Sequence, residues 1–222
     1  MSMHSPFRLG AALVLAAVLA TSPVQAQKVG TTSFQFLKVM PTARATGMGD
    51  AYVTLAEGAE ALFWNPAGVA AAGTHDLSAT HIPYLLDTRV SSIGYATSLG
   101  GLGSVGVQIQ AVDYGEIAET RTENLGFNSD GTYNPGLTGS TFGPTAFAVG
   151  VSYARRLTDR FSTGITGKYI YESLYTGSVT RNGETYDTSA GVALFDIGIQ
   201  YETGFRSLAL GMSVQNFGPE VA

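Results

Sequence analysis

The chain has little charge and no cysteine. Only 13% of its 222 residues are charged, about half the share of an ordinary water-soluble domain. Disorder does not explain the shortage, because 45% of the residues are hydrophobic and disordered chains have few of these. Without cysteine the chain has neither disulfides nor a lipoprotein anchor. Its 12 basic residues form no basic patch, so a nucleic-acid partner is not expected. From the low charge and the high hydrophobic content, a soluble β-sandwich and a membrane β-barrel are the remaining fold classes.

The chain also lacks a long apolar run. A membrane-spanning helix needs about 20 apolar residues, and the run Leu9–Ala20 is too short for one. It follows a basic region and precedes the small-residue site Val24-Gln25-Ala26, an order typical of a secretory signal peptide. We therefore expect residues 1–26 to be a signal peptide that is cleaved after Ala26. A retained anchor is the less favoured alternative.

Instead of apolar runs, the chain has segments that alternate with period two, as β-strands do. In Gly103–Asp113, residues 105, 107, 109 and 111 are apolar, whereas residues 104, 106, 108 and 110 are small or polar. Each segment has about ten residues, the length of a transmembrane strand. The predicted strands are Asp76–Leu86, Arg89–Leu99, Gly103–Asp113, Thr145–Arg155, Phe161–Tyr171, Ala193–Tyr201 and Ser207–Asn216.

The polar face of these segments distinguishes the two fold classes. A soluble sandwich strand normally turns Lys, Glu and Arg outward, but here that face carries Gly, Ser, Ala, Gln and Thr. Small uncharged residues suit a crowded lumen or contact with a plug. The sequence therefore predicts an all-β, transmembrane, antiparallel up-and-down β-barrel. An aromatic girdle at the lipid headgroups is predicted from tyrosines near strand ends, which are Tyr95, Tyr114, Tyr153, Tyr171 and Tyr201.

The connections between the predicted strands alternate in length. Leu99–Gly103, Arg156–Arg160 and Glu202–Arg206 are short, whereas Tyr114–Pro144 and Ser173–Ser189 are long. Outer-membrane barrels have short periplasmic turns and long external loops. The first long link is acidic, but it lacks the ligand spacing of a calcium loop, so we expect a solvated loop there.

Seven strands do not close a single-chain barrel, because bacterial barrels have an even number of strands. An open edge in lipid would also leave backbone groups unpaired. We therefore expect residues 74–222 to be the first strands of a longer barrel, with closure by an oligomer as the less favoured alternative. The turn signal Asn182-Gly183 allows the second long link to form two extended strands.

Residues 32–73 lack the alternation and carry two motifs. Gly47-Met48-Gly49-Asp50-Ala51-Tyr52 is followed by Ala61-Leu62-Phe63-Trp64-Asn65-Pro66-Ala67-Gly68. With these motifs the chain resembles the PorV/PorQ branch of the FadL-like outer-membrane proteins, and its later strands are similar to that family's barrel strands. The resemblance implies a barrel of about 14 strands when complete, about seven of them present here. It also implies that residues 27–73 form a plug or hatch in the lumen.

Within this segment, Gly47 and Gly49 permit positive φ and hence a sharp turn. Glu57–Phe63 is predicted to form one or two helical turns, which Pro66 ends. Asn65 can then bond local backbone groups. A plug without ligand contact and a gating hatch are both open alternatives. The predicted hatch motif comprises Gly47, Gly49, Asp50, Trp64, Asn65, Pro66, Ala67 and Gly68.

A few polar side chains fall on the lumen side of the predicted strands. We expect them to pair with one another or with the plug. They are Lys168, Asp196, Gln200 and Glu202. His75 and His81 would lie about 20 Å apart at about 3.3 Å per residue, too far to share a metal. With no catalytic motif either, we expect no enzyme, cofactor or metal site.

Two functions from different classes follow from the resemblance. A PorV-like protein would belong to a protein secretion system in the cell outer membrane and would pass cargo proteins to the cell surface. Its partners would be outer-membrane lipid, secretion-system proteins and cargo proteins. The alternative is FadL-like transport of hydrophobic small molecules, such as long-chain fatty acids, through a gated lumen. A purely structural barrel is a third hypothesis.

Overall fold

The computed structural model describes residues 33–175, 179–181, 184–186 and 188–219. The predicted signal peptide and the Asn182-Gly183 turn lie outside these residues. None of the described helices is long and apolar enough to cross a membrane. The helices are η1 (Gln35–Lys38), α2 (Ala43–Gly47), η2 (Glu60–Phe63), η3 (Pro66–Ala71) and η4 (Gly100–Leu102). The strands are β1 (Asp76–Pro83), β2 (Arg89–Ser98), β3 (Ser104–Asp113), β4 (Ile117–Phe127), β5 (Tyr133–Phe142), β6 (Thr145–Thr158), β7 (Phe161–Ser173), β8 (Val179–Arg181), β9 (Glu184–Tyr186), β10 (Ser189–Glu202) and β11 (Ala209–Phe217).

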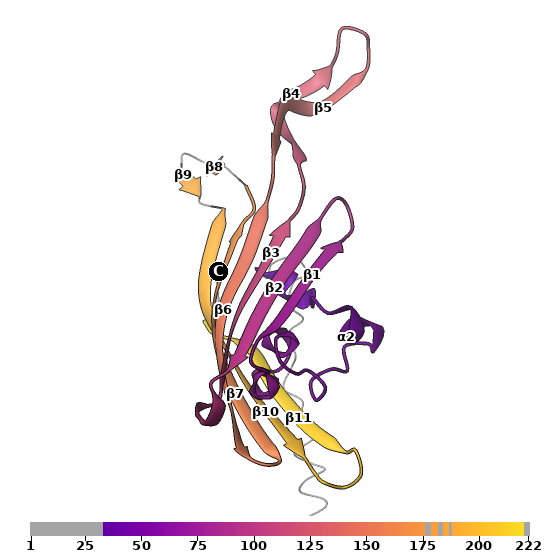
Figure 1. Ribbon diagram of the computed structural model, residues 1–222. Coiled ribbons are helices and arrows are strands. Elements are labelled where there is room, and N and C mark those ends of the chain that lie inside the picture. Colours follow the sequence, from indigo (N-terminus) through magenta and orange to yellow (C-terminus); the bar gives the residue numbers. More distant parts are fainter. Residues whose placement is uncertain (1–32, 176–178, 182–183, 187, 220–222) are drawn as a thin grey trace, which may run out of the picture. The chain divides into compact units, whose positions relative to one another are not determined.

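Seven strands form one antiparallel sheet in the order β1-β2-β3-β6-β7-β10-β11 (Figure 1). They overlap the seven predicted segments, and the all-β prediction is confirmed, with strands that neighbour each other in chain order. β4–β5 and β8–β9 are separate hairpins, inserted into the two long links. β1 and β11 are the edges of the sheet, which is not closed into a barrel.

β1 is shorter than predicted and ends at Pro83. Leu86 and Asp87 both have positive φ, of 54° and 61°, the conformation of a tight hairpin turn. The turn is closed by the Thr88 amide, which donates to the Leu85 carbonyl at 3.1 Å. The period-two pattern of the sequence therefore continues past the end of β1, into residues that form the turn.

The sheet has two different ends. At one, which we call the turn end, short connections join β2 to β3, β6 to β7 and β10 to β11. At the other, the loop end, lie the β1–β2 connection and both inserted hairpins (Figure 1). The three predicted short turns therefore lie at one end and the two predicted long links at the other, and the short β1–β2 turn joins the long links at the loop end.

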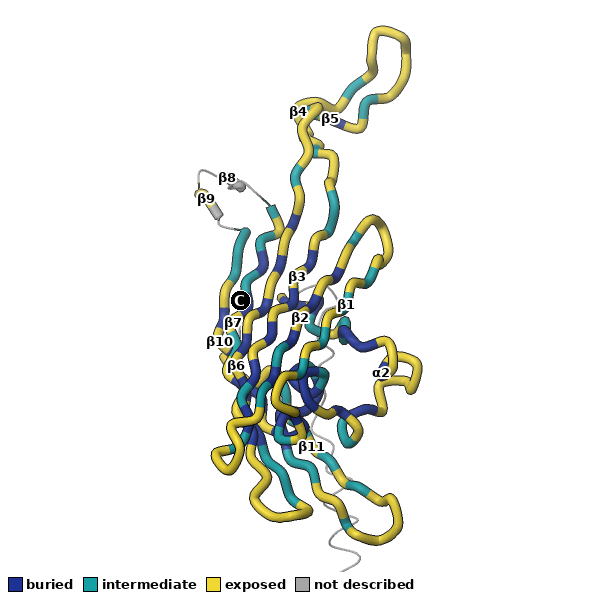
Figure 2. Tube along the Cα trace, viewed as in Figure 1, coloured by how far each residue is buried: buried dark blue, intermediate teal, exposed yellow. Residues whose placement is uncertain are grey.

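The apolar face of the sheet is the exposed one. Val151 is 60% exposed, whereas the neighbouring Ser152 is 1% exposed. The same alternation of buried and exposed residues is seen along β3, β6 and β10 (Figure 2). A water-soluble sheet buries its apolar face, so this inversion is the pattern of a wall that faces lipid. Large apolar side chains on the exposed face include Ile93, Val107, Ile109, Val149, Ile165, Phe195, Ile197, Leu210, Met212 and Val214.

Four of the five predicted girdle tyrosines lie on the exposed face, and Tyr114 does not. Its hydroxyl donates to Glu172 Oε1 at 3.2 Å, and its ring packs against a buried cluster that includes Val112. Tyr114 follows the last residue of β3 and has the same parity as Val112, which turns it to the buried side. The girdle prediction is therefore wrong for this residue.

The buried face of the sheet is covered by Ser33–Gly73, which we call the N-terminal segment. Tyr52, Leu62 and Trp64 of this segment pack against Ala96 and Ala154 of the sheet. A second cluster joins Phe34 and Phe36 to apolar residues near the loop end. The small residues of the sheet are explained by this contact, because the backbone of the segment lies directly against them.

Candidate functional site

Asn65 fixes the N-terminal segment to the sheet. Its side chain is fully buried, and its Nδ2 donates to the carbonyls of Val53 at 2.9 Å and Ile199 at 3.1 Å. Its Oδ1 accepts the Ala67 amide at 3.1 Å and so caps η3. Asn65 has extended backbone, as expected before proline. Pro66, however, begins η3 instead of only ending a helix, because proline suits the first helical position.

Asn65→Ala is expected to lower the free energy of unfolding by about 2–4 kcal/mol. The substitution removes a helix cap and takes this donor from two partly buried carbonyls. Equilibrium unfolding of the full chain in detergent measures the loss. Asn128→Ala is the matched control, because the Asn128 amide bonds Thr132 at the exposed tip of a hairpin. Similar losses in the two variants would contradict a special role for Asn65.

The remaining residues of the predicted hatch motif fall into two groups. Trp64, Pro66, Ala67 and Gly68 are buried, and Trp64 Nε1 donates to Thr42 Oγ1 at 3.0 Å. Gly47, Gly49 and Asp50 are exposed at the end of α2. Gly49 and Asp50 have positive φ, of 63° and 64°, but Gly47 is the last residue of a right-handed helix. The prediction that Gly47 supplies positive φ is therefore wrong, and Asp50 does so instead.

An ion pair lies on the buried face between β7 and β10. Lys168 Nζ is 2.8 Å from Asp196 Oδ2, with the two side chains 8% and 2% exposed. Asp196 Oδ1 also accepts the Asn216 amide of β11 at 2.7 Å. Two of the predicted lumen-facing residues therefore pair with each other and tie three strands together.

The other two predicted lumen-facing residues have different surroundings. Gln200 Nε2 donates to the carbonyls of Val53 at 3.2 Å and Ala56 at 3.1 Å, so it contacts the N-terminal segment. Glu202 has the same parity but is exposed at the turn end, where β10 ends. In the part of the chain that the structure describes, its carboxylate forms no ion pair.

Glu172 is a site residue that the sequence did not reveal. It is buried, and its carboxylate accepts the Phe34 amide at 2.8 Å and the Tyr114 hydroxyl at 3.2 Å. Burial and the charge of Glu172 raise the pKa of Tyr114 to about 12. The predicted strand stopped at Tyr171, one residue short. Continued alternation would have placed Glu172 on the lumen side.

Little space is left between the N-terminal segment and the sheet. A cavity of about 20 Å³ there is lined by Gln108, Lys168 and Gln215, among others. This is room for about one water molecule, and far less than the roughly 300 Å³ of a small-molecule pocket. Gln108 Oε1 has no hydrogen-bond partner within the described ranges. The segment therefore packs closely against the sheet at this place.

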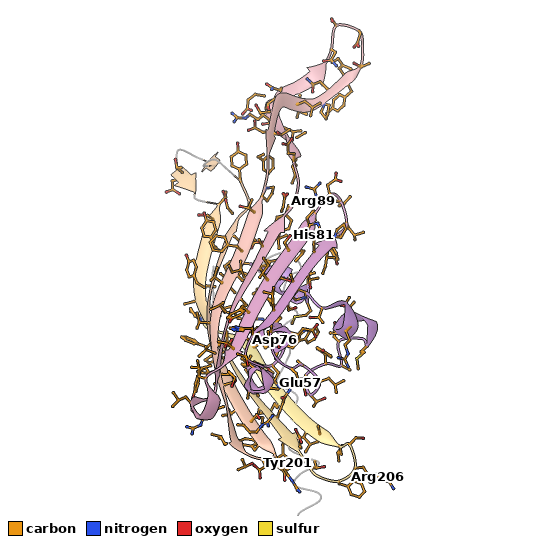
Figure 3. All side chains as sticks on the ribbon, viewed as in Figure 1. Glu57, Asp76, His81, Arg89, Tyr201 and Arg206 are labelled. Carbon is orange, nitrogen blue, oxygen red and sulfur yellow. The ribbon has the colours of Figure 1, made fainter. Side chains whose placement is uncertain are left out.

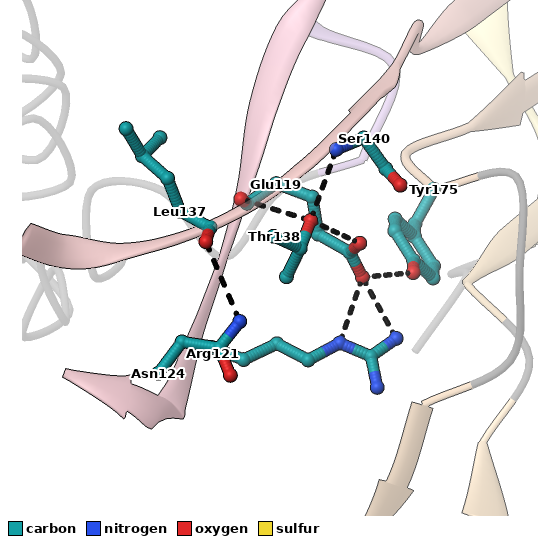
Figure 4. A network of polar contacts seen from close by, with 7 residues as sticks. All are labelled: Glu119, Arg121, Asn124, Leu137, Thr138, Ser140 and Tyr175. Carbon is teal, nitrogen blue, oxygen red and sulfur yellow. Dashed lines mark hydrogen bonds and ion pairs between the residues drawn. The ribbon is translucent and has the colours of Figure 1, made fainter.

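At the loop end, Glu119 joins the β4–β5 hairpin to the link between β7 and β10 (Figure 4). Its Oε1 accepts from Arg121 Nε at 3.1 Å, Arg121 Nη2 at 2.9 Å and the Tyr175 hydroxyl at 2.8 Å. Its Oε2 accepts from Thr138 Oγ1 at 2.9 Å. These hydrogen bonds, led by those from Arg121, hold the pKa of Glu119 below its ordinary value.

Acid is expected to loosen this hairpin. A carboxyl group with a lowered pKa stabilises its contacts above its ordinary pKa, and that stability is lost as the pH falls through the lowered value. The contact between Glu119 and Tyr175 should therefore persist at pH 6 and weaken below the ordinary value of 4.5. Hydrogen exchange of β4–β5 amides, corrected for intrinsic rates, measures this.

Tyr175→Phe should raise exchange in the hairpin on the order of fivefold at pH 6, the effect of one hydrogen bond. In this variant, acidification should change the hydrogen exchange of the hairpin less than it does in the native chain. Tyr133→Phe is the control, because Tyr133 lies exposed at the hairpin tip. Equal effects of the two substitutions would contradict the assignment.

The chain matches one family model. The model is described as type IX secretion system protein PorV, and the match covers residues 22–221. It includes the N-terminal segment, the seven-stranded sheet and both inserted hairpins. No curated protein sequence matches the chain.

Proposed function

The chain belongs to the family of the type IX secretion system protein PorV, and from this premise we propose that it is an outer-membrane component of that secretion system. The exposed apolar face of the sheet carries the proposal, because an outward apolar face is typical of the lipid-facing wall of an outer-membrane barrel. Residues 1–26 would direct export, and residues 27–73 would form a plug. In lipid the edge strands β1 and β11 need backbone partners, so the proposal includes closure of the sheet into a barrel.

We propose protein recognition, and no catalysis, at the loop end. Secreted cargo proteins would contact the β4–β5 hairpin before they are passed to the cell surface. The hairpin tip exposes Phe127 and Tyr133, which are 78% and 60% exposed and pack edge to face with ring centroids 5.6 Å apart. Exposed aromatic side chains are enriched in protein interfaces.

Transport of hydrophobic small molecules is the less favoured function. It requires an apolar path through the lumen, whereas the cavity described above, between the N-terminal segment and the sheet, has room for about one water molecule. The family match also supports the secretion hypothesis.

Complementation of a deletion strain tests the proposal. The strain should trap cargo in the periplasm while fatty-acid uptake stays normal, and the full native chain should restore export. A Phe127→Ser/Tyr133→Ser variant should lower surface cargo about tenfold, the effect of losing about 1.4 kcal/mol of binding. Leu85→Ser/Leu86→Ser is the matched control, because these exposed apolar residues lie in another connection at the same end. Normal cargo export in the deletion strain would contradict the proposal. Export by the Phe127→Ser/Tyr133→Ser variant at the native level would also contradict it.

A further inference from the structure

Four arginines gather at the turn end of the sheet. All four are exposed, and none forms an ion pair with a described residue. Two lie at the end of β6, one in the β6–β7 turn and one in the β10–β11 turn. We call them the arginine patch: Arg155, Arg156, Arg160 and Arg206.

The two turns that carry the patch are in contact. The Arg160 carbonyl accepts the Glu202 amide at 2.8 Å, and Arg160 Nη1 donates to the Thr203 carbonyl at 3.5 Å. Arg206 lies in the same β10–β11 turn, with its guanidinium 5.6 Å from the ring centroid of Phe205. Figure 3 shows Arg206 and Tyr201 at this end of the sheet, opposite Arg89 and His81. Arg160 and Arg206 therefore lie on two contacting turns, and Arg155 and Arg156 lie at the end of β6 that leads into the first of these turns.

This surface carries excess positive charge. Asp159 and Glu202 are the carboxylates of the same turns, against four arginines. The loop end has net negative charge, because acidic residues outnumber Arg89, Arg121 and Arg181 there. Those acidic residues are Asp87, Asp113, Glu116, Glu119, Glu123 and Asp130.

Apolar side chains lie among the arginines. Leu157 is 55% exposed and Phe205 is 67% exposed. Tyr153 and Arg155 share one parity on β6, so the exposed apolar face continues directly into the patch. Arg155 is about 7 Å along the strand from Tyr153, at about 3.3 Å per residue. Aromatic rings at strand ends mark the level of the lipid headgroups, so the patch begins at that level.

We propose that the arginine patch binds anionic phospholipid headgroups of the membrane leaflet at the turn end. Guanidinium groups form bidentate hydrogen bonds with phosphate oxygens, and the neighbouring leucine and phenylalanine fit the boundary with the acyl chains. The continuity of the patch with the lipid-facing wall favours a lipid over a soluble acidic protein. This inference rests on the membrane location proposed above.

Lipid binding by the full chain tests the inference. In detergent, native mass spectrometry compares phosphatidylglycerol with phosphatidylcholine. We expect at least tenfold tighter binding of phosphatidylglycerol, weakened by salt because the contacts are ionic. The fourfold substitution Arg155→Gln/Arg156→Gln/Arg160→Gln/Arg206→Gln should remove the preference, whereas the control Arg89→Gln/Arg121→Gln at the loop end should keep it.

Several outcomes would overturn the inference. One is equal binding of the two lipids by the native chain. This comparison does not depend on whether a variant folds. Others are a phosphatidylglycerol preference that survives the fourfold substitution, and competition by free glycerol phosphate as strong as that by the lipid. Failure of the chain to insert into bilayers would instead overturn the proposed function. Insertion without a phosphatidylglycerol preference would overturn this inference alone.

Discussion

Gly164→Ala is expected to displace the N-terminal segment from the sheet, whereas Gly167→Ala on the same strand should be tolerated. A Cβ atom at Gly164 would collide with the Pro66 carbonyl and would lie 2.7 Å from the Ala67 nitrogen. Both obstacles are backbone atoms of η3, which the segment cannot move cheaply. At Gly167, on the exposed face, the added carbon would lie 3.8 Å from the Phe195 ring, an ordinary contact.

The expected cost of Gly164→Ala is about 3 kcal/mol, at the upper end for overpacking because the neighbours are backbone. Unfolding of the full chain and limited proteolysis of the N-terminal segment measure the effect. The segment should become sensitive to protease in the Gly164 variant and stay protected in the Gly167 variant. If both variants resist protease equally, the segment does not pack against the sheet as described.

Loss of either partner of the buried ion pair is the second large effect. Lys168→Met leaves the Asp196 carboxylate unpaired, and Asp196→Asn leaves the Lys168 ammonium unpaired. Each single substitution should cost about 3–5 kcal/mol, because an uncompensated charge is left away from water. Asparagine at position 196 keeps an oxygen that can accept the Asn216 amide, so the second change removes charge with little loss of hydrogen bonding.

The double substitution Lys168→Met/Asp196→Asn should then recover to within about 1–2 kcal/mol of the native chain, since neutral replacement of a buried pair is often tolerated. A double-mutant cycle of unfolding free energies measures the coupling. Additive losses in the double variant would show that the two residues act independently, contrary to the 2.8 Å contact.

Period-two alternation was sufficient to predict the sheet, because one face of each strand is less exposed than the other. It also placed Lys168, Asp196 and Gln200 on the buried face. It did not reveal which residues pair. Lys168 is directly opposite Leu194, and its partner is two residues further along β10, so the ion pair depends on strand register. Register is set by contacts along the whole sheet.

The N-terminal segment was the part least accessible from the sequence. Its conformation depends on distant contacts, such as the hydrogen bond from Asn65 to the Ile199 carbonyl. Local propensity correctly predicted the extended backbone of Asn65, but it misplaced the role of Gly47. The β4–β5 hairpin was predicted only as a solvated loop, because its pairing is interrupted by register shifts around Thr120 and its alternation is correspondingly weak.

The central claim is that the apolar face of the sheet contacts lipid. Because the chain has no cysteine, a single introduced cysteine can carry a nitroxide label at a known position. In lipid vesicles containing the full chain, a label at Val151→Cys should collide often with oxygen and rarely with a water-soluble nickel chelate. A label at Phe127→Cys, on the exposed hairpin tip, should show the reverse. Access of the nickel chelate to position 151 equal to that at position 127 would contradict the account.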